Sequence, residues 1–155
     1  MTGEQWIIYW NEYTADTYLY GSEIIFHRRD DVELVNHLLP SGTVIHQWYS
    51  KTNFQVQRIE PSLPMIDGES AYLVQAHIEC AKAEEYLIRV IFFNRYDMEV
   101  DSVIIRDGEG TFQCPLSTYS YQIQLISGGL TAFHFHNILI KEIADETDEK
   151  NKAIK

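Results

Sequence analysis

Apolar and polar residues alternate one by one through much of the second half of the chain. Counted from Tyr72 to Cys80, every second residue is apolar, and Tyr121, Ile123 and Leu125 are separated by glutamines. Because successive side chains of a strand point to opposite faces of the sheet, this period of two predicts strands with one buried and one wet face. Residues 87–93 are almost all apolar, which predicts a central strand.

The alternation changes phase near residue 136. Phe133 and Phe135 occupy odd positions, whereas Ile138 and Ile140 occupy even positions. A strand cannot move its apolar set to the other face without an extra residue. This change therefore predicts a β-bulge near residues 136–137.

The first half of the chain is also strand-like, although it is less regular. Strands are expected over residues 6–10, 22–27 and 43–49. Residues 31–39 are ambiguous, because Val32, Val35 and Leu39 have helical spacing, while residues 32–35 alone suit a short strand. We favour the strand.

Turn residues separate these segments and complete the fold prediction. Pro40, Ser41 and Gly42 form the clearest turn, and the polar segment 50–64 is expected to be a long surface loop. Nine or ten strands without a convincing helix predict an all-β fold, an antiparallel two-sheet β-sandwich of jelly-roll type. We expect one domain over residues 1–141 and a disordered acidic and lysine-rich tail over residues 142–155.

The charge of the chain disfavours two classes of partner. The 155 residues include 12 Lys and Arg against 23 Asp and Glu, which gives a net charge of −11. Phosphate backbones and anionic lipids attract the opposite sign, so neither nucleic-acid binding nor electrostatic capture by a membrane is expected. The apolar runs fall far short of the roughly 20 residues that span a bilayer, and no secretory signal is recognisable. A cytoplasmic protein is expected.

The two cysteines, Cys80 and Cys114, each lie in or beside an apolar segment. Free cysteines are usually buried as small apolar side chains, which is the reading we favour. A single bridge between the two stays open.

The most suggestive enzyme motif lies near residue 134. Gly128, five further residues and the pair His134 and His136 match the opening of the cupin metal motif, G-x5-H-x-H. Two histidines at i and i+2 share one strand face and could share a metal. The motif next requires a Glu near residues 140–141, but Ile140 and Lys141 stand there. We therefore expect no metal and no cofactor, with His134 and His136 on a polar outer face.

Other catalytic motifs are absent from the sequence. It contains no G-x-S-x-G nucleophile elbow, no P-loop and no G-x-G-x-x-G. Paired carboxylates for glycoside hydrolysis depend on three-dimensional spacing and are not favoured by anything here. No catalytic residue is assigned, and an enzyme is not expected.

Aromatic residues gather at the start of the chain and again around residue 50. Trp6 and Trp10 belong to the first group, and Trp48, Tyr49 and Phe54 form the second. On a sandwich, aromatic faces beside amides and acids can stack on sugars or form a protein interface, or they can simply fill the core.

A set of residues spread over positions 6–140 resembles a known family. The set comprises Leu39, Pro40, Ser41, Gly42, Ile45, His46, Trp48, Ser50, Thr52, Asn53, Gln55, Leu63 and Pro64, with flanking matches at Tyr18, Leu19, Tyr20, Gly21, Phe92, Phe93, Arg95, Glu109, Gly110, Thr111, Phe112, Tyr119, Ser120, Tyr121, Leu125 and Ile126. It resembles the third accessory secretory protein of the Gram-positive accessory Sec system. The segment from Pro40 to Trp48 is the most specific part.

The resemblance implies a non-catalytic subunit of a cytoplasmic complex with the first and second accessory secretory proteins. It also implies work with a SecA-type motor and a SecY-type channel, which would place the complex peripherally at the membrane. The exported cargo would be a glycosylated serine-rich-repeat adhesin. The family fold is similar to carbohydrate-binding modules, so the alternative function is recognition of glycans on that adhesin.

The candidate partner or ligand surface follows from the same segment. After the turn at Pro40, Ser41 and Gly42, a regular strand over residues 43–49 would place Val44, His46 and Trp48 on one face. We expect Trp48 to be at least partly buried, with His46 and Asn53 nearer the surface. The candidate surface residues are His46, Trp48, Asn53 and Gln55.

Overall fold

The computed structural model describes residues 5–10, 21–50, 63, 69–80 and 86–143. Ten strands run through this part of the chain: β1 (Gln5–Ile8), β2 (Glu23–Arg28), β3 (Asp31–Val35), β4 (Val44–Tyr49), β5 (Ala71–Glu79), β6 (Tyr86–Phe93), β7 (Glu99–Arg106), β8 (Glu109–Gln113), β9 (Ser120–Ser127) and β10 (Ala132–Ile143). The described residues contain no helix, as the alternating pattern predicted.

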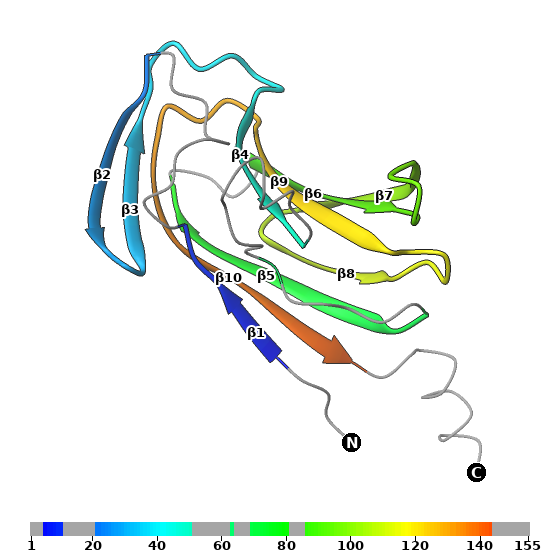
Figure 1. The fold of residues 1–155 in the computed structure, drawn as a ribbon. Coiled ribbons are helices and arrows are strands. Elements are labelled where there is room, and N and C mark those ends of the chain that lie inside the picture. The colour runs from blue at the N-terminus through cyan, green and yellow to red at the C-terminus, as the bar shows by residue number, and fades with distance from the viewer. Residues whose placement is uncertain (1–4, 11–20, 51–62, 64–68, 81–85, 144–155) are drawn as a thin grey trace, which may run out of the picture.

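The strands form two antiparallel sheets (Figure 1). The first sheet has six strands in the order β2-β3-β10-β5-β8, with β1 also paired to β10, and the second has four strands in the order β4-β9-β6-β7. The antiparallel two-sheet fold expected from the sequence is confirmed.

The long strand β10 organises the six-stranded sheet. Its first part pairs with β3, its last part pairs with β1 on the same side, and β5 follows almost its whole length on the other. The register with β5 shifts between Phe135 and Asn137. This shift is the predicted bulge, and it allows Phe133, Phe135, Ile138 and Ile140 all to be buried.

The core lies between the two sheets and takes one face of each strand. Tyr72 and Val74 of β5 are buried against Val90 and Phe92 of β6 in one apolar cluster, which also includes Ile123 of β9. The glutamines of β9 alternate with its core residues and stay partly exposed. The period of two in the sequence therefore identified both faces of β5 and β9 correctly.

Several local expectations can be compared with the structure. The ambiguous segment 31–39 contains the strand β3, which pairs with both β2 and β10. The thiols of Cys80 and Cys114 do not form a disulfide. Strand β10 extends to Ile143, two residues beyond the expected end of the domain at 141, and residues 144–155 lie outside the described part. Within the described residues, no helix has the length and apolar character to cross a membrane.

The turn at Pro40, Ser41 and Gly42 leads into β4. The backbone N–H of Thr43 donates to the carbonyl of Pro40 at 3.3 Å, and Gly42 has a φ of +90°. Residues with side chains rarely adopt this left-handed conformation, which explains the glycine. The N–H of Gly42 also donates to the carbonyl of Ser127 at 2.7 Å, which ties the turn to the end of β9.

Candidate functional site

The candidate segment 43–49 contributes rings to the core. His46 lies flat on Trp10, with ring centroids 4.5 Å apart, and meets the edge of Trp48 at 4.6 Å. Trp48 in turn stacks on Phe135 of β10 at 5.4 Å. His46 is 5% exposed and Trp48 is 1% exposed. Four rings from separate parts of the chain thus meet inside the sandwich.

The expectation that His46 lies nearer the surface is wrong, because His46 shares its strand face with the buried Trp48. Strand β4 also contains a bulge. The register between β4 and β9 shifts between Val44 and His46, so Ile45 is an extra residue in the strand. A regular strand would place Ile45 and His46 on opposite faces, but both are buried. Burial lowers the pKa of His46 to about 3, which keeps the imidazole neutral near pH 7.

Trp48 is buried, in agreement with the expectation that it is at least partly buried. Its indole Nε1 donates a hydrogen bond to the backbone carbonyl of Tyr9 at 3.1 Å, which satisfies the polar end of the ring. The other two candidate residues, Asn53 and Gln55, lie outside the described residues. A partner surface at Asn53 and Gln55 therefore stays a prediction, whereas His46 and Trp48 serve the core of this chain.

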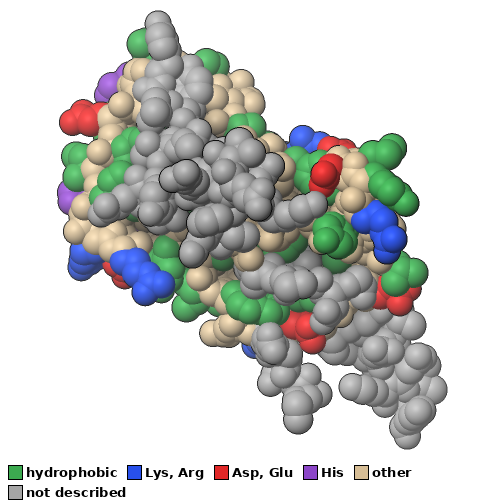
Figure 2. Space-filling model, viewed as in Figure 1, with side chains coloured by type: hydrophobic (Ala, Val, Ile, Leu, Met, Phe, Trp, Pro, Cys, Tyr) green, Lys and Arg blue, Asp and Glu red, His purple; other side chains and the backbone are tan. Residues whose placement is uncertain are grey.

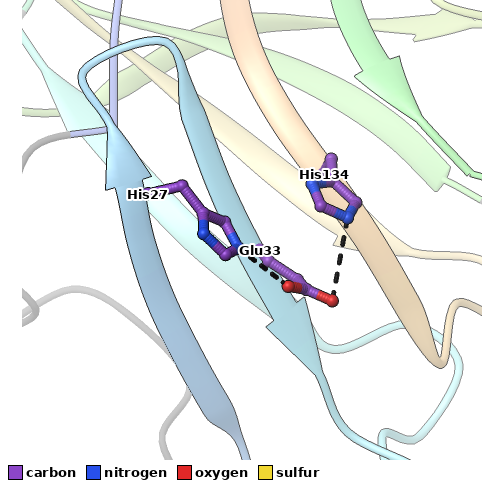
Figure 3. Close-up of side chains that lie close together, drawn as sticks. All are labelled: His27, Glu33 and His134. Atoms are coloured by element: carbon purple, nitrogen blue, oxygen red, sulfur yellow. Dashed lines mark hydrogen bonds and ion pairs between the residues drawn. The ribbon is translucent and has the colours of Figure 1, made fainter.

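A second cluster of titratable side chains lies on the outer face of the six-stranded sheet, where His27, Glu33 and His134 approach one another (Figure 3). Glu33 and His134 are directly opposite each other on the paired strands β3 and β10. The register between β2 and β3 shifts between Phe26 and Arg28, so His27 is the extra residue of a bulge. His27 shares the sheet face of Ile25, which is directly opposite Glu33, and its Nε2 donates to the carboxylate of Glu33 at 2.9 Å.

His134 is held by a carboxylate on its other side. Its Nδ1 donates to Oδ1 of Asp31 at 2.8 Å, while its Nε2 lies 3.7 Å from Oε2 of Glu33. The hydrogen bond to Asp31 raises the pKa of His134, and the same bond lowers the pKa of Asp31. Acids and histidines therefore hold one another in a defined geometry on this face.

His136 does not join His134 in a shared site. Its Nδ1 donates to the backbone carbonyl of Asp30 at 2.7 Å, and its Nε2 lies 3.2 Å from Oε1 of Glu79. The bulge in β10 falls at His136 and ends the regular alternation between the two histidines. The group of metal-ligating side chains on this face includes His134 and leaves out His136. The sequence motif therefore included one member of this group, His134, and one residue outside it, His136.

A third feature is a group of exposed apolar residues at and beside the turn from β6 to β7, which we call the apolar end: Tyr96, Met98, Val100 and Tyr119. Tyr96 and Met98 lie in the turn, where Oδ1 of Asn94 accepts hydrogen bonds from both backbone N–H groups. Tyr119 is tied to the same end through its N–H, which donates to the carbonyl of Phe93 at 2.7 Å. Figure 2 shows hydrophobic side chains at the surface around this end of the four-stranded sheet.

The apolar end has the chemistry of an interaction surface. Tyr96 is 75% exposed, Tyr119 is 63% exposed and Met98 is 62% exposed. Single exposed apolar residues are ordinary, but several large ones at one end of a sheet are the residue types found at protein interfaces. The period-two pattern does not identify these residues, because alternation cannot separate an exposed apolar face from a buried one.

Comparison with known proteins shows where this chain belongs. The family described as "Accessory Sec secretory system ASP3" matches residues 17–142. The ASP3 protein of the accessory Sec system of Streptococcus gordonii is 39% identical over 150 residues, which cover 91% of this chain and 94% of that protein.

Solved structures give the same result. A chain in the crystal structure of accessory secretory protein 1, 2 and 3 in Streptococcus pneumoniae has a TM-score of 0.83 and 29% identity, covering 88% of this chain and 95% of that one. A chain of the Glycosylation Associate Protein (Gap123) complex from Streptococcus agalactiae has a TM-score of 0.85 and 29% identity, covering 92% of this chain and 46% of that one. Carbohydrate-binding modules are also similar in fold, at TM-scores below 0.5, a level that says nothing about a bound glycan. The extent of the family match and the 39% identical relative together show that this chain belongs to the ASP3 family of the accessory Sec secretory system.

Proposed function

We propose that this chain is a subunit of an accessory Sec complex and that its co-subunits are accessory secretory proteins 1 and 2. The observation that carries the proposal is the similarity to a chain of the accessory secretory protein 1, 2 and 3 structure, which extends over 95% of that chain. A shared fold alone does not imply a shared function. Similarity over nearly the whole of that chain, together with family membership, supports the same mode of assembly.

The apolar end is the surface we assign to this contact. Its tyrosines and methionine belong to the residue types enriched at protein interfaces, and β7 is the last strand of its sheet. The turn that carries Tyr96 and Met98 is ordered by Asn94, so a partner would meet a preformed surface. Asn53 and Gln55 remain a second proposed contact.

The finer role rests on family membership alone. The subunit acts without catalysis in the cytoplasm, peripherally at the membrane, and supports export of serine-rich-repeat glycoprotein adhesins through the SecA-type motor. Each of these steps follows from the family resemblance and goes beyond the two complexes whose subunits are named above.

Co-purification tests the proposal directly. Tagged full-length chain should capture untagged accessory secretory proteins 1 and 2. The double variant Tyr96→Ser, Met98→Ser should reduce capture at least about tenfold, since central interface residues often contribute more than about 1.4 kcal/mol each. Leu38→Ser is the matched control, because Leu38 is 71% exposed in a different turn. Failure of the wild-type chain to capture either protein would contradict the complex, whereas equal capture by the double variant would contradict only the surface.

Glycan recognition is the second candidate function, and one observation favours it. On the outer face of the four-stranded sheet, Gln47 of β4 accepts a hydrogen bond from Gln124 of β9 at 3.1 Å, and Tyr49 lies opposite Gln122 in the same strand pair. Amides beside an aromatic ring can bind sugar hydroxyls and stack on the sugar ring. The chain should then bind a glycosylated serine-rich-repeat peptide in a titration and should not bind the unglycosylated peptide. Gln124→Ala should weaken binding of the glycosylated peptide.

A further inference from the structure

Three potential ligand atoms converge on the outer face of the six-stranded sheet, from three neighbouring strands. They are supplied by His27 of β2, Glu33 of β3 and His134 of β10, and all lie within 4.8 Å of one another (Figure 3). Glu33 is 2.9 Å from Nε2 of His27 through one oxygen and 3.7 Å from Nε2 of His134 through the other. Neighbouring ligands on a tetrahedral ion with bonds of about 2.0–2.1 Å are separated by about 3.3–3.4 Å, a value between these two distances.

The ring of His134 is already oriented for a ligand at Nε2. Asp31 accepts the hydrogen bond from Nδ1 at 2.8 Å and is only 17% exposed in its side chain. When a carboxylate accepts a hydrogen bond from one ring nitrogen of a histidine, it fixes the orientation of the ring and makes the other ring nitrogen a better metal ligand. The Asp31–His134 pair therefore supplies the supporting contact that most zinc-binding histidines have.

We propose that this cluster binds one Zn²⁺ ion through Nε2 of His27, the carboxylate of Glu33 and Nε2 of His134, with solvent completing the coordination. Two imidazoles and one carboxylate form a donor set typical of zinc, whereas Mg²⁺ and Ca²⁺ prefer oxygen ligands alone. This proposal departs from the expectation, drawn from the incomplete cupin motif, that no metal binds. It is independent of the proposed function in the accessory Sec complex.

The ion would join an edge of the sheet to its centre. Strand β2 is the last strand in its sheet and pairs with β3, while β10 lies on the other side of β3. A metal held by His27 and His134 therefore spans three strands and links the β2–β3 hairpin to the strand that organises the sheet. Because the unfolded chain does not hold these ligands together, the ion stabilises the folded state by mass action.

The test uses the full-length chain, stripped of metal with EDTA and exchanged into buffer at pH 7.5. Titration with ZnCl₂ should show one equivalent bound per chain and a higher melting temperature, and CoCl₂ should give visible absorption bands of a bound ion. His27→Ala, Glu33→Gln and His134→Ala should each weaken zinc affinity at least about 100-fold. Asp31→Asn should weaken it about 10–100-fold, the range typical of supporting residues around a metal.

Two histidine variants serve as controls. His37→Ala removes an exposed histidine from the turn after β3, and His136→Ala removes the companion that the sequence motif suggested. Both should bind zinc as the wild-type chain does. Circular dichroism in EDTA verifies that each variant is folded before titration. Loss of zinc binding in His136→Ala with retention in His27→Ala would overturn the proposal. Absence of binding by the folded wild-type chain at 100 µM ZnCl₂ would also overturn it, because a dissociation constant of roughly 100 µM is the upper limit for a specific site.

Discussion

His46 and His134 place the same side chain in opposite surroundings. His46 lies between Trp10 and the edge of Trp48 in the core, and burial lowers its pKa to about 3. His134 lies on the outer face of the six-stranded sheet, where its bond to Asp31 raises its pKa. Regular alternation determines both faces: His46 shares its face with the buried Trp48, whereas His134 lies between the buried Phe133 and Phe135 and faces outward.

The comparison shows two roles for a histidine ring, one in packing and one in hydrogen bonding. Inside, the neutral imidazole acts as a flat packing element and contributes through contact area and stacking. Outside, the ring is ordered by hydrogen bonds to carboxylates, and such exposed pairs contribute little to stability. The inner cluster should therefore determine whether the chain folds, and the outer cluster should determine what the folded chain can bind.

The largest expected effect is in the inner cluster. Trp48→Ala should lower the free energy of unfolding by about 3–5 kcal/mol, because it removes a buried ring that packs on His46 and Phe135 and leaves a cavity. It also removes the donor that satisfies the carbonyl of Tyr9. Urea denaturation followed by circular dichroism measures the change.

Trp48→Phe is the control for that experiment. It keeps most of the apolar volume and loses the indole N–H, so its cost should be clearly smaller than that of Trp48→Ala. A loss below about 1 kcal/mol for Trp48→Ala would show that Trp48 is not part of the core and would leave it as a candidate partner residue.

The second prediction uses the pKa of His46. The unfolded histidine titrates near 6.5 and the folded one near 3, so between these values the unfolded chain binds a proton that the folded chain does not. Stability is therefore fully present above pH 6.5 and is lost as the pH falls. The slope approaches about 1.4 kcal/mol per pH unit, or about 2 kcal/mol between pH 6.5 and pH 5.

His46→Leu isolates this contribution, because leucine is apolar and does not titrate. Denaturation curves at pH 7.5, 6.5, 5.5 and 5 should show a difference between the two proteins that changes steadily in favour of the variant as the pH falls. Parallel pH dependence in the two proteins would mean that His46 titrates normally in the folded state, and the contrast with His134 would disappear.

Much of the fold was predictable because each segment of alternating apolar and polar residues is longer than the turns that separate these segments. In β10, the change of parity between Phe135 and Ile138 revealed the bulge, since apolar residues on both sides of it report the face. In β4 the same device is invisible: Val44 and Ile45 are both apolar, so the extra residue leaves no mark in the pattern. The burial of Ile45 on the same side as His46 could not be predicted for this reason, whereas the burial of His46 was missed because histidine is less often fully buried than apolar residues.

The outer cluster was less accessible to sequence analysis than the core. His27 and Glu33 share one face of the β2–β3 hairpin, because His27 lies on the same face as Ile25, which is directly opposite Glu33, and no local spacing in the sequence reports that register. The partnership of Glu33 with His134 depends on pairing between segments about 100 residues apart, which no local spacing reports. The turn at Gly42, by contrast, is determined locally and was predicted from three residues.

The smallest expected effect completes the comparison. In EDTA, His27→Ala should change the free energy of unfolding by no more than about 0.5 kcal/mol, because its side chain is 41% exposed and its hydrogen bond to Glu33 lies at the surface. The measurement is the same urea titration at pH 7.5 that serves Trp48→Ala. Saturating ZnCl₂ should then stabilise the wild-type chain by at least about 2.7 kcal/mol at 100 times the dissociation constant, and should leave His27→Ala almost unchanged. If His27→Ala instead lost more than about 2 kcal/mol in EDTA, the outer cluster would itself be a structural element, and the division between an inner cluster that folds the chain and an outer cluster that binds would not hold.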